Sequence, residues 1–73
     1  MQTILYELRK EVKHVTQKEV ADYLGISVNT YRNKEKGSSE FTQDEMFLLS
    51  SYFNMPIHKI FLPRKHQIGN NAS

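Results

Sequence analysis

The chain has 73 residues, 38% of them hydrophobic and none a cysteine, so it can build one small core but no disulfide or thiolate site. Ten Lys and Arg against eight Asp and Glu give a formal net charge of +2, which permits a nucleic-acid partner without requiring one. Its apolar runs are too short to span a bilayer, and its first residues lack the apolar region of a signal peptide. We therefore expect one all-α domain in the cytoplasm.

Apolar residues at three- and four-residue spacing predict a first helix from about Thr3 to Lys13. Glu7 and Arg9 fall on its solvent side, and its apolar stripe contains Ile4, Leu5, Leu8 and Val12.

The next helix begins in "VTQKEV". Thr16 is its predicted N-cap, Glu19 completes a capping box, and Val15 with Val20 forms a hydrophobic staple. We expect this helix to end at Leu24, because Gly25 can adopt the left-handed conformation that closes a helix.

Three further helices are predicted by the same reasoning. Ser27 caps a third helix that ends at Gly37. Thr42 and Glu45 form a capping box for a fourth, which reaches Asn54 and buries Met46, Leu49 and Phe53. Pro56 opens a short fifth helix, "PIHKIF", and Pro63 stops it; residues 63–73 are expected to be a flexible tail.

A glycine-containing turn this short between the second and third helices is typical of a helix-turn-helix, whose second helix enters the DNA major groove. On the third helix, Ser27, Thr30, Tyr31 and Lys34 share one stripe, and the opposite, outward side carries Val28, Asn29, Arg32, Asn33 and Lys36. Asn can pair with adenine, Arg with guanine and Val with a thymine methyl, whereas Lys suits a phosphate. The alternative is an ordinary solvated helix face.

The stretch "TQKEVADYLGISVNTYRNKEKG" resembles the helix-turn-helix of Cro and phage-repressor proteins, the XRE family, and the likeness covers about residues 4–62. Its marks are Gln17, Ala21, Gly25, Ile26 and the Glu35-Lys36-Gly37 ending. The resemblance implies a compact five-helix lambda-repressor-like domain over residues 1–62, with its helix-turn-helix at 17–36. It also implies a mostly dimeric protein that binds double-stranded DNA.

The resemblance further implies that Gln17 contacts a phosphate and braces the first recognition residue, although it could be an ordinary first-turn residue. Free N–H groups at helix starts make other residues candidate phosphate contacts. The candidate base readers are Val28, Asn29, Arg32 and Asn33; the candidate phosphate contacts are Thr16, Gln17, Lys18, Ser27, Lys34 and Lys36.

Two features depart from the family pattern. Lys34 replaces a residue that is usually apolar and inward, so we expect its stem along the core and its ammonium at a phosphate. The segment from Arg9 to Thr16 is one residue longer than usual, which bears on the ion pair that the pattern assigns between a first-helix arginine and Glu35.

The fourth helix is more apolar than one buried stripe needs. We weigh an ordinary core edge against a homodimer surface formed by Phe47, Leu48, Tyr52, Met55 and Ile57.

These features predict a sequence-specific transcriptional regulator, a small Cro-like repressor of phage or prophage origin that occupies a pseudo-palindromic operator and is nucleoid-associated when bound to DNA. An antitoxin-type autorepressor and a protein-interaction module without DNA binding are the alternatives. We expect no enzyme activity, cofactor, small-molecule ligand or membrane contact. His14, His58 and His66 lie in different segments, so we expect no metal site either.

Overall fold

The computed structural model describes residues 1–61, and every regular element in this range is helical. The predicted all-α class and five-helix architecture are confirmed. The predicted tail at 63–73 and the stop at Pro63 lie outside the described residues. In chain order the elements are α1 (Thr3–Glu7), which continues directly into the π-helix η1 (Leu8–Lys13), then α2 (Gln17–Leu24), α3 (Val28–Lys36), α4 (Gln43–Phe53) and α5 (Ile57–Ile60).

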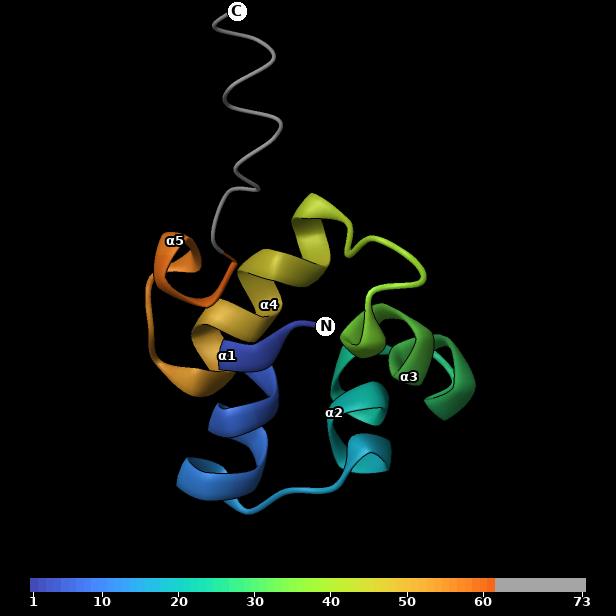
Figure 1. The fold of residues 1–73 in the computed structure, drawn as a ribbon, viewed down its shortest axis with the longest axis horizontal. Coiled ribbons are helices and arrows are strands. Elements are labelled where there is room, and N and C mark those ends of the chain that lie inside the picture. The colour runs from blue at the N-terminus through green and yellow to red at the C-terminus, as the bar shows by residue number, and fades with distance from the viewer. Residues whose placement is uncertain (62–73) are drawn as a thin grey trace, which may run out of the picture.

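The helices divide into two neighbouring groups, as Figure 1 shows. α2 and α3 lie together on one side, and α1, α4 and α5 lie on the other. The N-terminus lies between the groups, where the backbone N–H of Gln2 donates to the carbonyl oxygen of Glu35 at 2.8 Å. The end of α3 is therefore fastened to the start of the chain.

Local sequence sets the helix starts as predicted. The hydroxyls of Thr16 and Thr42 each accept from the N–H of the third helical residue at 3.1 Å. The carboxylates of Glu19 and Glu45 accept from the threonine N–H groups at 2.8 and 2.9 Å, completing both capping boxes. Ser27 caps α3 by accepting from Thr30 N–H at 3.1 Å.

The helices also end at the predicted residues. Gly25 and Gly37 close α2 and α3 in left-handed conformations, with φ of 77° and 97°. Asn54 closes α4 in the same region, with φ of 55°. Asn is the non-glycine residue that tolerates this conformation best, because its short polar side chain can hydrogen-bond locally.

The first helix differs from the prediction in its second half. Residues 8–13 form a π-helix that ends at a left-handed His14, with φ of 57°. The extra residue of a π-turn rotates the later side chains away from the positions they would take on an α-helix. Val12, predicted on the apolar stripe, is therefore 66% exposed, and this prediction was wrong because it assumed an unbroken α-helical period. Arg9, predicted on the solvent side, is buried. That prediction was wrong because it followed the charge of Arg9, which stands four residues after Leu5 and so shares its face of the helix.

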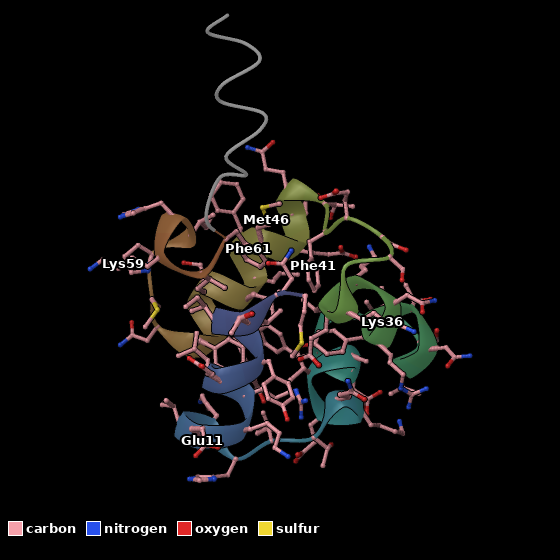
Figure 2. The ribbon with its side chains drawn as sticks, viewed as in Figure 1. Glu11, Lys36, Phe41, Met46, Lys59 and Phe61 are labelled. Atoms are coloured by element: carbon pink, nitrogen blue, oxygen red, sulfur yellow. The ribbon has the colours of Figure 1, made fainter. Side chains whose placement is uncertain are left out.

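One core joins all the helices. The rings of Tyr31 and Phe41 meet edge to face with centroids 5.9 Å apart, and Phe41 meets Phe61 at 5.4 Å. Figure 2 shows Phe41 and Phe61 with Met46 beside α4; Met46, predicted buried, packs on the core but stays partly exposed. The buried apolar residues are Leu5, Leu8, Val20, Ala21, Tyr31, Phe41, Leu49, Phe53 and Ile60.

The two helix-closing glycines give a test of this fold. Gly25→Ala is expected to lower the free energy of unfolding by about 1–2 kcal/mol, because a Cβ disfavours the left-handed conformation, although no neighbouring atom lies within 4 Å of the added carbon. Gly37→Ala is expected to cost more, since its Cβ would also lie 3.3 Å from the backbone nitrogen of Met1. Urea unfolding followed by far-UV circular dichroism measures both losses, and equal losses would contradict this packing.

Candidate nucleic-acid interface

Residues 25–27 form a short, fixed turn between α2 and α3. The N–H groups of Gly25 and Ile26 donate to the carbonyl oxygens of Asp22 and Ala21 at 3.2 and 3.0 Å, which satisfies the end of α2. Ile26 packs on the core, and Ser27 already caps the next helix. Each residue of the turn is fixed by a hydrogen bond or by packing, so the angle between the helices is fixed too.

The outer face of α3 carries polar side chains. Asn29, Arg32, Asn33 and Lys36 are exposed, as predicted. Figure 2 shows Lys36 on α3, on the opposite side of the molecule from Lys59 on α5. The structure therefore gathers three hydrogen-bonding side chains and a lysine on one accessible helix face.

The inner face of α3 is rotated slightly from the predicted one. Tyr31 is fully buried and Glu35, one turn later, is 3% exposed. Val28 precedes Tyr31 by three residues and so shares its face; it packs partly on the core. Thr30, predicted inward, is exposed. The predicted outward place of Val28 and inward place of Thr30 were wrong, because Tyr31 rather than residue 30 lies at the centre of the buried stripe.

A buried carboxylate anchors this inner face. Glu35 accepts from Arg9 in a bidentate pair, Nε to Oε2 at 2.9 Å and Nη2 to Oε1 at 3.2 Å. Gln17 Nε2 and the Tyr31 hydroxyl each donate to it at 2.9 Å. Arg9 also donates to the carbonyl oxygen of Val15 at 3.1 Å. Among the described residues, no buried side-chain polar atom lacks a partner.

Gln17 carries this network outward to the exposed face. Its Oε1 accepts from Arg32 Nε at 3.3 Å, and Arg32 Nη1 donates to Asn29 Oδ1 at 2.8 Å. A continuous run of hydrogen bonds thus leads from the buried Arg9 to the exposed Asn29. The two exposed side chains are held to each other and to the start of α2.

A second ion pair ties α3 to α4. Lys34 Nζ lies 2.6 Å from Glu45 Oε1, with both side chains 12% exposed. The same oxygen closes the Thr42 capping box, and the ammonium lies 5.9 Å from the centroid of the Phe41 ring. Lys34 is inward as predicted, but its ammonium is held by Glu45 rather than directed to the outer face.

The start of α2 presents polar groups beside this face. The first N–H groups of a helix have no partner within the helix and lie at the positive end of its dipole. Thr16 and Lys18 are exposed there, and Gln17 is half-buried. Lys18 pairs with Asp22 at 3.1 Å, but both side chains are more than 60% exposed, so the lysine can exchange partners at little cost.

A family model described as helix-turn-helix matches residues 5–60. The chain belongs to the Cro/phage-repressor (XRE) type of helix-turn-helix family. No curated protein and no solved structure matches it significantly. This family consists of DNA-binding regulators rather than enzymes, and the protein is a double-stranded-DNA-binding transcription regulator of the XRE type.

This XRE-type domain offers no metal cluster or membrane span within residues 1–61. No group of three His, Asp or Glu side chains there could hold a metal ion. No helix in the same range is long and apolar enough to cross a bilayer. His66 lies outside the described residues.

The five predicted dimer residues are not equally exposed. Phe47 and Leu48, on the outer side of α4, are 55% and 39% exposed. Tyr52 is half-buried, with its ring 4.6 Å from that of Tyr23 and under the ammonium of Lys13 at 4.9 Å. Met55 and Ile57 are half-buried. α4 therefore exposes one apolar pair, and the other three residues extend it only partly.

Two residues central to the XRE-type interface were not identified as such from the residues alone: Arg9 and Glu45. Arg9 stands on a polar-looking side of the first helix, and only the family pattern associates it with Glu35. Glu45 was assigned to a cap, which it does form. Its ion pair with Lys34 could have been inferred from the sequence, because an inward lysine needs a nearby anion.

The buried carboxylates predict acid-sensitive stability. Burial alone would raise the pKa of Glu35, but hydrogen bonds from Arg9, Gln17 and Tyr31 and the charge of Arg9 outweigh it, so the pKa lies below its ordinary value of 4.5. Burial likewise opposes the hydrogen bonds from Lys34 and Thr42 at Glu45, whose pKa is also lowered. Because the unfolded chain binds these protons more readily, the free energy of unfolding is expected to be largest above pH 4.5 and to fall as the pH drops below it.

Urea unfolding at a series of pH values between 7 and about 3 measures this loss. The neutral double variant R9M/E35Q removes the ion pair and leaves one amide oxygen at position 35 as an acceptor for Gln17 or Tyr31. It is expected to show a shallower acid loss than the wild type. Identical pH profiles would mean that Glu35 does not contribute.

Proposed function

We propose that the protein is a Cro-like repressor that acts by occupying an operator and excluding polymerase. The observation that carries the proposal is the polar outer face of α3. Its inner face is tied to η1, α2 and α4 by one buried ion pair, one partly buried ion pair and Gln17. A recognition helix held in this way can dock in the major groove without first becoming ordered, which lowers the cost of binding.

In this proposal Asn29, Arg32 and Asn33 read bases. Arg and Asn side chains carry the donors that base edges accept in the major groove. Val28, half-buried, offers only its outer methyl surface to a thymine methyl.

Phosphate contacts in this proposal come from the polar residues around the base readers, namely Thr16, Gln17, Lys18, Ser27 and Lys36. Lys34 is left out because its ammonium is held by Glu45. Phosphate contacts fix the register of the protein on DNA without reading sequence.

We also propose a homodimer through α4. Phe47 and Leu48 form an adjacent exposed apolar pair in a chain whose other large exposed apolar side chains, within residues 1–61, are Met1, Val12 and Tyr23. A two-fold dimer would set its recognition helices about 34 Å apart, one turn of DNA, on a pseudo-palindromic operator.

Selection of binding sites from random duplex DNA tests the function. We expect an enriched pseudo-palindrome that the protein binds at least about a thousandfold more tightly than scrambled DNA. No enrichment, with weak salt-sensitive binding only, would favour a protein-interaction module on this fold instead.

Two alanine variants test which residues contact bases and which contact phosphates. Lys36→Ala is expected to weaken binding to all sequences and to reduce the slope of log K against log salt by about one. Arg32→Ala is expected to cost about 1–3 kcal/mol chiefly on the selected site. Circular dichroism checks that both exposed substitutions leave the fold intact, and equal losses on every sequence would overturn the division.

The dimer surface predicts a separate outcome. Phe47→Glu is expected to reduce binding of the full operator to the level of a half-site while leaving half-site binding unchanged, because two like charges would meet at the two-fold axis. Val12→Glu is the matched control, since Val12 is equally apolar and even more exposed but lies on η1. Analytical ultracentrifugation with labelled operator reports the stoichiometry, and unchanged two-to-one binding by Phe47→Glu would exclude α4 as the interface.

A further inference from the structure

Asn29 and Arg32 are joined by a hydrogen bond before any DNA is bound. Arg32 Nη1 donates to Asn29 Oδ1 at 2.8 Å, and Arg32 Nε donates to Gln17 Oε1 at 3.3 Å. Gln17 is fixed in turn, because its Nε2 donates to the buried carboxylate of Glu35 at 2.9 Å. The two exposed side chains therefore have one shared arrangement rather than two independent ones.

This arrangement decides which groups stay free for DNA. A guanidinium carries N–H donors on Nε and on both Nη atoms. The Nε–H and one N–H of Nη1 are engaged, which leaves Arg32 the outer end of its fork, Nη2 with the second N–H of Nη1. That end can still donate to O6 and N7 of a guanine.

The amide oxygen of Asn29 has one of its two acceptor positions occupied in the same arrangement. Bidentate recognition of adenine needs the amide oxygen to accept from N6 while the amide nitrogen donates to N7. Here the oxygen lies 2.8 Å from a cationic donor, so an adenine amino group beside it would face the N–H groups of Arg32. The amide N–H₂ of Asn29 is therefore the group that can contact a base without bringing a base donor against Arg32.

We propose that Asn29 and Arg32 recognise DNA as a single donor-only unit, positioned by Gln17. This inference rests on the proposed function. The unit selects guanine opposite Arg32. Opposite Asn29 it selects guanine or thymine; adenine also offers an acceptor at N7, but its neighbouring N6 amino group would lie against the N–H groups of Arg32. Asn29 does not select adenine as long as Arg32 holds its oxygen, and Gln17 acts as a positioning residue for the guanine contact.

The first test compares binding sites selected by the wild type, Asn29→Ala and Arg32→Ala. Asn29→Ala identifies the Asn29 position as the one that loses its preference. At that position we expect the wild type to select guanine or thymine, and Arg32→Ala to select adenine, because the amide oxygen is released. Discrimination at the Arg32 position should fall by roughly 5- to 150-fold, the usual worth of a bidentate contact.

Gln17→Ala tests the positioning role. It should lower guanine discrimination opposite Arg32 but leave the preference opposite Asn29 unchanged, since the Arg32–Asn29 contact does not involve Gln17. Asn33→Ala is the matched control: Asn33 is exposed on the same helix face but its side chain is not part of this run of hydrogen bonds. It should change only its own base position.

A second readout needs no DNA. In the free protein, Arg32→Ala should shift the side-chain amide resonances of Asn29 in a nitrogen-15 correlation spectrum, and Asn33→Ala should leave them in place. Unmoved Asn29 resonances would overturn the proposal. So would a wild type that selects adenine opposite Asn29, even though the repressor function would then stand. If no sequence is enriched at all, both the proposed function and this inference fail.

Discussion

The position of the recognition helix depends on one buried carboxylate. Glu35 brings together donors from η1, from the first residue of α2 and from its own helix. Burying a charge is costly unless it is paired and fully hydrogen-bonded, and here both conditions are met. The same contacts that satisfy the charge also fix where α3 lies against its neighbours. A half-satisfied version of this network would be worse than an apolar one, so the arrangement favours one geometry strongly.

The π-turn in the first helix lies at one partner of the Arg9–Glu35 ion pair. The first helix widens into a π-helix at Leu8–Lys13, and a π-helix takes up an extra residue per turn without breaking the helix. Arg9 lies at the start of this widened turn and still reaches both Glu35 and the carbonyl oxygen of Val15. The widened turn ends with an exposed Val12 and a left-handed His14, while the ion pair between Arg9 and Glu35 is made.

Features set by contacts between residues close in sequence were predicted correctly, and features set by distant contacts were not. Every capped helix start and glycine-closed end was predictable, because Thr16, Ser27 and Gly25 act on residues within one turn of themselves. The π-turn was not predicted, and the ion pair that Arg9 makes from it joins residues 26 positions apart in the chain. The phase of α3 was misjudged only in part: Tyr31 was correctly placed inward, but Val28 packs on the core and Thr30 is exposed. Of the candidate site, the exposed polar residues were found, but the contacts that join them were not.

α3 presents fewer charged side chains on its outer face than its sequence contains. The stretch from Arg32 to Lys36 contains three cations and one anion, yet Glu35 and Lys34 are both turned inward and paired with Arg9 and Glu45. The outer face keeps Arg32 and Lys36 with two asparagines and no anion. A chain with a net charge of only +2 therefore offers a locally cationic surface on α3, because the one anion of this stretch is buried. The inward ion pairs contribute no net charge, and the attraction to phosphate is governed by the charges left exposed.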